Sequence, residues 1–243
     1  MITINHLTKC FGKKIAVDNI SFSADTGIIT GLIGSNGSGK STTMRMIATL
    51  LKQNQGTIAI DGIDTVKHPQ KARGKIGILL GGDVSLYERL TAKENILYFA
   101  DLQGVDRTVA NRRLDDLSEL LDMKAYLHRR VGGFSRGMRQ KVAFARSIIH
   151  SPDVLLLDEP STGLDINSIK DVQNFILYCK SQGKTILLST HNAHEMQRLC
   201  DHLVFIENGK IVAKGEKNVL LQESRCHDTA DLFFYYRERS RQS

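Results

Sequence analysis

A glycine-rich run that ends in a lysine and a serine is the segment of this chain best suited to chemistry. It reads Gly34-Ser-Asn-Gly-Ser-Gly-Lys-Ser41. Its glycines let the backbone curl until several N–H groups face one anion, and a helix that follows turns its positive dipole end towards that anion. Lys40 would then reach the β- and γ-phosphates of a nucleotide, and the Ser41 hydroxyl would hold Mg²⁺. The predicted nucleoside triphosphate site comprises Gly34, Ser35, Asn36, Gly37, Ser38, Gly39, Lys40, Ser41 and Thr42.

Two adjacent carboxylates supply the second chemical element. Asp158 and Glu159 follow the apolar run Val154-Leu-Leu-Leu157 and precede a proline. The carboxyl end of a buried strand is the edge of an α/β sheet where ligands bind. Asp158 would hold the Mg²⁺ shell, and Glu159 would polarise the water that attacks the γ-phosphate. The alternative is a solvent-facing acidic turn; paired with the glycine-rich loop, the carboxylates favour hydrolysis by water over transfer to a second substrate.

These residues need strands and helices in a fixed order to meet. The apolar run 27–33 predicts a buried strand before the glycine-rich loop, and residues 42–51 have helical spacing. Residues 154–157 and 185–189 read as buried parallel strands, joined by a helix at about 166–181. Further short strands are predicted at 2–7, 15–22, 56–60 and 76–80, and a hairpin at 203–214 around Asn208-Gly209.

Between residues 91 and 145 the helical signals dominate. Thr91-Ala-Lys-Glu94 is a capping box that opens a helix through Leu102, a second helix runs from about Thr108 to Leu121, and Ser135 caps a third that ends near His150. The predicted fold class is α/β: a P-loop NTPase core with a mostly parallel sheet, an N-terminal antiparallel β sub-domain and this helical insert. The main domain is expected to span 1–222, with a C-terminal tail at 223–243.

Composition sets limits on the partners. The chain has 33 basic and 26 acidic residues, a net charge of +7, which suits an anionic ligand or an anionic membrane face without choosing between them. The cysteines show no paired spacing, so neither zinc nor a disulfide framework is indicated. No stretch approaches the roughly 18 apolar residues of a membrane span, and no signal sequence opens the chain. An intracellular protein that does not cross a bilayer is expected.

A third segment, Val131-Gly-Gly-Phe-Ser-Arg-Gly-Met-Arg-Gln-Lys-Val-Ala-Phe-Ala-Arg146, resembles the signature segment of the ATP-binding cassette (ABC) ATPases. The run Asp158-Glu-Pro-Ser-Thr-Gly-Leu-Asp165 is similar to their Walker B motif and D-loop, and Ser189-Thr-His191 to their switch histidine. The match is collinear from about residue 2 to residue 220. The resemblance implies ATP as the nucleotide and Mg²⁺ as its metal ion.

The resemblance assigns further roles. Ser135 and Gly137 would bind the γ-phosphate of ATP on a second subunit, which implies a head-to-tail dimer, expected to be a homodimer, with two buried ATPs. His191 would donate a hydrogen bond to the γ-phosphate and act with Glu159 and Lys40 in catalysis. Asp165 would connect the two sites, and Phe11 would stack on adenine. Taken alone, Ser135 is also a plain helix cap, His191 a structural histidine and Phe11 an ordinary core or surface residue.

The sequence departs from the family in two places. Where the family carries a glutamine after the strand at 76–80, this chain has Gly81 and Gly82, with Asp83 nearby as an alternative oxygen. The signature has Arg136 and Met138 in place of glycine and glutamine, but keeps the serine and glycine that touch phosphate.

A separate polytopic membrane permease follows as the expected partner, docked on the helical insert and the 76–90 loop, with this subunit peripheral at the cytoplasmic face of the cell membrane. Residues 81–100 are similar to the sodium-efflux and drug-efflux branch of exporters. The aromatic-then-basic tail 233–243 favours a solvated helix end over membrane contact. A DNA-repair or chromosome-associated ABC ATPase would need zinc-binding cysteines or a long heptad insertion. The sequence has neither, so no nucleic acid is expected as a partner. The other alternative, a P-loop kinase or adaptor, would need an acceptor pocket in place of the signature helix.

Overall fold

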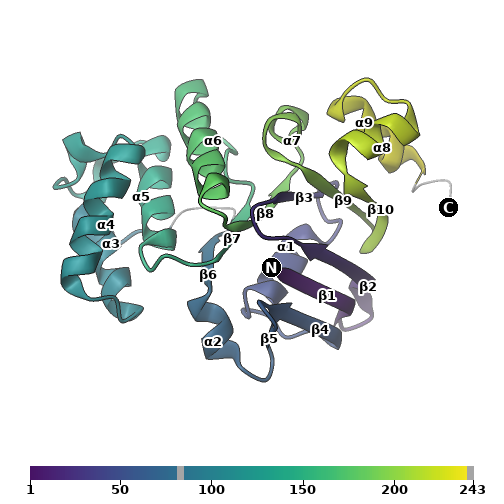
Figure 1. The fold of residues 1–243 in the computed structure, drawn as a ribbon, viewed down its shortest axis with the longest axis horizontal. Helices are drawn as coiled ribbons and strands as arrows, with labels where there is room; N and C mark the ends of the chain where they lie inside the picture. Colours follow the sequence, from purple (N-terminus) through teal and green to yellow (C-terminus); the bar gives the residue numbers. More distant parts are fainter. Residues whose placement is uncertain (81–84, 240–243) are drawn as a thin grey trace.

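Two β-sheets form the frame of the protein. The computed structural model describes residues 1–80 and 85–239. The first sheet is antiparallel, with strand order β2-β1-β4-β5. Its strands are β1 (Ile2–Phe11), β2 (Lys14–Ala24), β4 (Gln55–Ile60) and β5 (Ile63–Asp64). This sheet is the predicted N-terminal β sub-domain, which is thereby confirmed (Figure 1).

The second sheet runs through the centre of the molecule, in the order β10-β9-β3-β8-β7-β6. Its strands are β3 (Ile29–Ile33), β6 (Ile76–Leu79), β7 (Val154–Asp158), β8 (Thr185–Thr190), β9 (His202–Glu207) and β10 (Lys210–Glu216). All neighbours are parallel except β9 and β10, which form the predicted hairpin. Every residue of β3, β7 and β8 is buried, because both faces of the sheet are covered.

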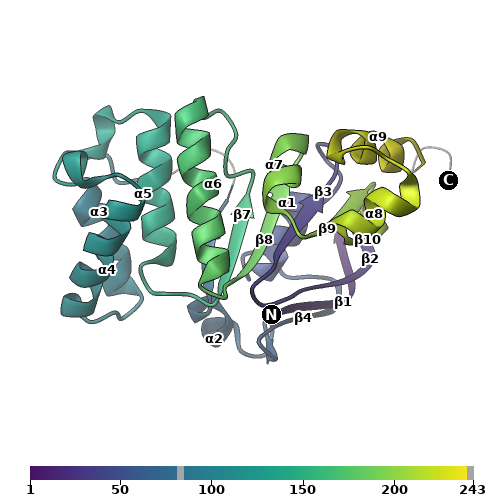
Figure 2. The same ribbon diagram turned by 45° about the horizontal axis from the view of Figure 1, so that its top comes forward.

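Alternate residues of the central strands feed two cores. In β7, Leu155 and Leu157 belong to the core shared with the helices of the opposite face, whereas Val154 and Leu156 join the core shared with the N-terminal sheet. Helix α1 (Lys40–Ile47) lies on the N-terminal side, and α6 (Ile166–Ser181) and α7 (Ala193–Leu199) cover the other face (Figure 2). The glycine-rich loop therefore emerges between two packed layers.

The helical insert forms a lobe at one end of the central sheet (Figure 1). It contains α3 (Ala92–Leu102), α4 (Arg107–Leu120) and α5 (Arg136–Ile148). The capping box at Thr91 and Glu94 is present, Asp106 caps α4, and Ser135 caps α5. These caps confirm the three predicted helices to within a few residues, since each start is encoded locally.

Some elements differ from the sequence-based prediction. Helix α1 begins at Lys40 instead of residue 42 and ends at Ile47, because Thr49 adopts a φ of 60° that a helix does not allow. The short helices α2 (Pro69–Gly74) and α7 were not predicted. No helix in the described ranges 1–80 and 85–239 is long and apolar enough to cross a bilayer.

The C-terminal segment packs on the core along one side. It contains α8 (Lys217–Ser224) and α9 (Thr229–Arg239). Leu232 and Tyr236 belong to the main core, and the Thr229 hydroxyl donates to the carbonyl oxygen of Ala193 at 2.7 Å. The predicted solvated helix end therefore holds for the exposed side of α9, where Phe234 is 55% exposed, and not for the buried side. The boundary at 222/223 stays a prediction.

Candidate active site

The end of strand β9 holds the glycine-rich loop in place. The backbone N–H and the hydroxyl of Ser35 both donate to Glu207, at 2.9 and 2.6 Å. At Gly34 an added Cβ would stand 2.1 Å from the carbonyl oxygen of Ile206, so only glycine fits. Gly39, directly before α1, has a φ of 113°, a region that glycine reaches without strain. The loop is thus fixed in its curled form by the strand beneath it.

Lys40 lies inside this loop with its ammonium group held by carbonyls. Its Nζ donates to the carbonyl oxygens of Gly34 and Ser35, at 2.7 and 2.9 Å. Burial lowers the pKa of Lys40, and the carboxylates of Glu159 and Asp158 oppose that shift by favouring the charged form. A nucleotide phosphate at the loop would offer this cation a full anionic partner.

The acidic residues lie where β7 ends. Asp158 is buried and accepts a hydrogen bond from the Ser189 hydroxyl on the neighbouring strand β8. Glu159 has a φ of 49°, uncommon for a residue with a side chain, and its N–H donates to the carbonyl oxygen of Ser189 at 3.0 Å. The Thr162 hydroxyl donates to Oε2 of Glu159 at 3.2 Å. The turn after β7 therefore holds the Glu159 side chain in one orientation.

His191 follows β8 and meets Glu159. Its Nδ1 lies 3.0 Å from Oε1 of Glu159, and the two side chains are 47% and 25% exposed. An ionised carboxylate only accepts hydrogen bonds, so Nδ1 carries the hydrogen of this contact.

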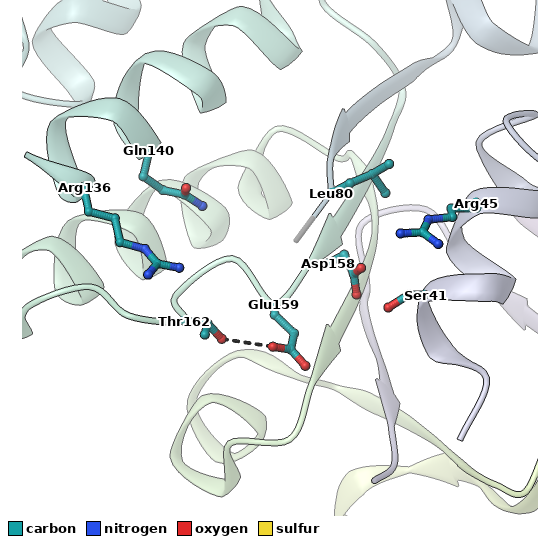
Figure 3. Close-up of a pocket in the computed structure, with 8 residues that line it drawn as sticks. All are labelled: Ser41, Arg45, Leu80, Arg136, Gln140, Asp158, Glu159 and Thr162. Carbon is teal, nitrogen blue, oxygen red and sulfur yellow. Dashed lines mark hydrogen bonds between the residues drawn. The ribbon is translucent and has the colours of Figure 1, made fainter. Parts of the chain in front are cut away.

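Two adjoining hollows meet at Ser41 and Glu159. One, of about 260 Å³, is lined by the loop together with Phe11, Lys14 and Ala16. The other, of about 210 Å³, is shown in Figure 3 and is lined by Ser41, Arg45, Leu80, Arg136, Gln140, Asp158, Glu159 and Thr162. Ser41 and Glu159 border both hollows. A nucleotide lying along the first hollow would place its terminal phosphate at the shared wall.

The oxygen atoms at this wall fit a magnesium ion. Ser41 and Asp158 border the same hollow and their oxygens lie near each other in Figure 3. Mg²⁺ prefers one or two such protein oxygens, with phosphates and waters completing its shell. Within residues 1–80 and 85–239 no cluster of three or more His, Cys, Asp or Glu residues forms an all-protein metal cage. The donor set therefore suits a metal that arrives with a nucleotide.

The residues predicted to act across a dimer, Ser135, Gly137 and Asp165, lie outside both hollows in this single chain. The predicted residues His191, Gly34, Ser35 and Ser38 do not line the hollows either. Ser135 caps α5, accepting from the N–H of Met138 at 3.3 Å. Gly137 lies against α6, where an added Cβ would stand 2.2 Å from Oγ of Ser168. Asp165 caps α6, and hydrogen bonds from Ser168 lower the pKa of its carboxyl.

Phe11 borders the first hollow. It is 51% exposed, with Nζ of Lys9 5.2 Å from the ring centroid. One ring face contacts this lysine, and the position at the hollow is compatible with a stacked base. The departures at Gly81, Gly82 and Asp83 fall outside the described residues.

Sequence reasoning missed several residues that shape the site. Glu207 holds the loop, Ser189 holds Asp158, and Nε2 of Gln140 donates to the carbonyl oxygen of Pro160 at 2.8 Å. Arg45 and Arg136 point into the second hollow (Figure 3). In the sequence, Glu207 could have been noticed as a carboxylate directly before the Asn208-Gly209 turn. Gln140 could have been noticed as a polar residue among the apolar residues of α5. Neither signal is specific without the fold.

This geometry defines a P-loop nucleoside triphosphatase. A family model described as ABC transporter matches residues 17–162. The ABC transporter ATP-binding protein NatA of Bacillus subtilis is 46% identical over 96% of both chains. The Nod factor export ATP-binding protein I of Burkholderia lata is 33% identical over 96% of this chain and 76% of that protein. The chain therefore belongs to the ABC transporter family, and it is an ATPase subunit.

Solved structures agree with this assignment. One described as the ATP-binding subunit of an ABC transporter has a TM-score of 0.89 and 29% identity, covering 97% of this chain and 99% of that chain. A dimeric post-hydrolysis cassette bound to ADP and Pi, 23% identical, has a TM-score of 0.79 and covers 89% of this chain and 98% of its own. The second shows the fold alone. Both carry the cassette architecture predicted from the sequence.

Proposed function

We propose that this chain is the ATP-hydrolysing subunit of an exporter: it uses Mg²⁺, forms a dimer around two ATPs and drives a separate membrane-spanning permease at the cytoplasmic face. The observation that carries the hydrolytic assignment is the contact of His191 with Glu159, the carboxylate that borders both hollows. A carboxylate and an imidazole in that position can handle the proton of an attacking water.

In the proposed mechanism the chain's own groups divide the work. The loop N–H groups and Lys40 neutralise the phosphates, and Ser41 and Asp158 would hold Mg²⁺, which supplies further charge neutralisation. Glu159 accepts the proton of the attacking water at its carboxylate. His191, oriented through its Nδ1–H, reaches the γ-phosphate with the rest of its ring. A carboxylate at this position favours water as the nucleophile over the hydroxyl of a second substrate.

The proposed dimer accounts for Ser135, Gly137 and Asp165, which lie outside the hollows of the single chain. Ser135 is exposed at the N-terminus of α5, where N–H groups and the helix dipole favour an anion. We assign Ser135 and Gly137 to the γ-phosphate held by a second copy, and Asp165 to the contact between the two sites. Phe11 would stack on adenine.

The helical lobe offers a docking surface for the permease. Tyr87, Tyr98 and Leu102 are 50%, 42% and 62% exposed. The rings of Tyr87 and Tyr98 meet edge to face at 5.4 Å, and Arg146 lies 4.4 Å from the Phe99 ring. An exposed aromatic group of this kind is typical of a protein–protein interface. Relatives named for export, such as the Nod factor export ATP-binding protein I, support the proposed direction of transport.

The experiment that tests the catalytic assignment is Glu159→Gln. The change keeps the side-chain volume and removes the base, so ATP hydrolysis should fall by about 10²-fold or more. ATP binding should persist, and the variant should accumulate as an ATP-loaded dimer. Phosphate release and size-exclusion chromatography with MgATP measure both effects. Glu238→Gln, far along the chain in α9, serves as the control; wild-type turnover in Glu159→Gln would remove Glu159 from catalysis.

A further inference from the structure

A buried carboxylate lies directly behind the catalytic turn. Glu195, in α7, is only 2% exposed. Its Oε1 accepts a hydrogen bond of 2.6 Å from the hydroxyl of Ser161, which is itself buried. Neither residue borders the two hollows of the active site. Any effect of Glu195 on ATP hydrolysis must therefore be indirect, through the residues to which it is hydrogen-bonded.

Stability alone gives no reason for a carboxylate at this position. The hydroxyl of Ser161, which donates to the Glu195 carboxylate, is a neutral partner. Burial raises the pKa of Glu195, and hydrogen bonding to the hydroxyls of Ser161 and Thr190 only partly opposes the shift. A buried carboxylate held by neutral hydroxyls is less favourable than an apolar side chain of similar size. Its presence is better explained by what it connects.

Glu195 connects the two segments that carry the Glu159–His191 contact. Ser161 is two residues after Glu159, across Pro160, and Thr190 is one residue before His191. The N–H of Asn192 donates to Oγ1 of Thr190 at 3.0 Å, so the same hydroxyl also shapes the turn after His191. One carboxylate thus ties the loop after β7 to the loop after β8.

We propose that Glu195 is a positioning residue for ATP hydrolysis, which fixes Glu159 and His191 relative to each other through the hydroxyls of Ser161 and Thr190. This inference rests on the proposed roles of Glu159 and His191. It makes two predictions that a purely structural role would not make: the loss falls on kcat and not on KM, and the Ser161 and Glu195 substitutions act through one bond.

The test compares matched variants of the full chain. Ser161→Ala removes the hydroxyl and Ser161→Thr keeps it. Glu195→Gln keeps the side-chain volume but offers an acceptor on one side only. We expect Ser161→Ala and Glu195→Gln to lower kcat about tenfold, with KM for MgATP changed by less than about twofold, because the lost contact matters in the transition state. Ser161→Thr should restore most of the rate.

The double variant and a control complete the test. Ser161→Ala with Glu195→Gln should be within about twofold of the slower single variant, because the Ser161 hydroxyl acts through Glu195 and the two losses are therefore not independent. Met196→Leu, a buried change in the same helix, should keep wild-type kcat. Thermal unfolding of each variant confirms that the assays are done on folded protein.

Wild-type kcat in folded Ser161→Ala or Glu195→Gln would overturn the inference, as would multiplicative losses in the double variant or a change confined to KM. If Ser161→Thr does not fold, the isosteric Glu195→Gln still decides the question. An active Glu159→Gln would overturn the proposed catalytic roles themselves. An inactive Glu159→Gln beside fully active Ser161 and Glu195 variants would remove only the positioning role.

Discussion

At the scale of single residues, this site holds its charges with neutral groups. Lys40 is held by two carbonyls, Asp158 by a serine and Glu195 by hydroxyls. Such partners keep each charge in place without neutralising it. Lys40 and Asp158, which border the hollows, therefore remain available for a ligand that brings opposite charge, which is what a magnesium nucleotide does.

Lys40→Ala removes the cation of the loop, so the stabilisation of the fold by MgATP should disappear. At an ATP concentration about 100 times its dissociation constant, binding should add roughly 2.7 kcal/mol to the wild type. Thermal unfolding with and without MgATP measures the difference. Lys67→Ala, whose position borders neither hollow, should behave as wild type. An equal ATP effect in Lys40→Ala would show that nucleotide binds elsewhere.

His150 predicts how stability depends on pH. Its Nε2–H donates to the carbonyl oxygen of Ile76, and its buried Nδ1 has no hydrogen-bond partner within the described chain. Burial lowers the pKa of His150, and the charges of Lys184 and Arg113 lower it further. Above the ordinary histidine pKa of about 6.5 both states are neutral. Below it the unfolded chain binds a proton that the folded chain resists, so stability falls.

The measurement is urea unfolding at pH 7.5 and 5.5. Wild type should lose stability at the lower pH, and His150→Gln should lose less, because glutamine can donate to Ile76 and does not titrate. Comparing the two proteins removes the contribution of other titrating groups such as Glu195. Identical pH dependence in both would show that His150 does not titrate differently on folding.

At the scale of elements, local signals account for what the sequence predicted. The strand at 154–157, the capping box at Thr91 and the loop before α1 each carry their signal within a few neighbouring residues, and each is present. Helix α7 is only seven residues long and lacked enough periods to be recognised. Its placement depends on packing against α6 and α9.

The sequence predicted those residues of the site that lie within short, continuous motifs. Lys40, Asp158 and Glu159 lie in such motifs. Glu207 reaches Ser35 across 172 positions, and Glu195 reaches Ser161 across 34. No periodicity in one sequence joins residues so far apart, so these supporting side chains became visible only once the strands were placed next to one another.

Replacing two glycines of the loop by alanine should lower the free energy of unfolding by different amounts. At Gly34 an added Cβ would meet the carbonyl oxygen of Ile206 at 2.1 Å, and backbone cannot move aside cheaply. At Gly37 the φ is 82° and nothing lies within 4 Å. Gly37→Ala should therefore lower the free energy of unfolding by about 1 kcal/mol, through backbone strain alone. Gly34→Ala should cost about 3 kcal/mol or more. Urea unfolding without nucleotide compares them, and equal losses would contradict this account.

At the scale of the whole molecule, the proposed dimer would make each chain supply parts for two sites. Lys40 and Glu159 border the hollows of their own chain, whereas Ser135 does not. If Ser135 serves a second copy, then each ATP site needs two chains. An isolated subunit would then carry one part of each of two ATP sites and no complete site.

Mixing two inactive variants tests this composite site. Ser135→Arg should be inactive alone, because its bulk and charge block both interfaces of its own dimer, and Lys40→Ala should be inactive alone as well. Their heterodimer contains one site with intact Lys40 and intact Ser135 from opposite chains. Mixing should therefore restore part of the ATPase activity, about half of the wild-type rate for each heterodimer and about a quarter for a randomly paired equimolar mixture if the sites work independently.

A cross-link decides the case in which both sites must be competent. Asn36 is exposed and Ser38 is buried, so cysteines belong at 36 and 135, in a Glu159→Gln chain without Cys10 and Cys226. The buried Cys179 and Cys200 can remain. The link should form between chains and only with MgATP. A link within one chain, or one that forms equally without nucleotide, would favour a self-contained P-loop enzyme.

The backbone of Glu159 has a consequence for the history of this protein. A side chain at a φ of 49° is tolerated there, while glycine would adopt the same turn without strain. A population of variants screened only for resistance to heat would therefore drift towards glycine at this position and lose the carboxylate. A glutamate at a position that glycine would fill with less strain is what the proposed catalytic role of Glu159 would lead us to expect.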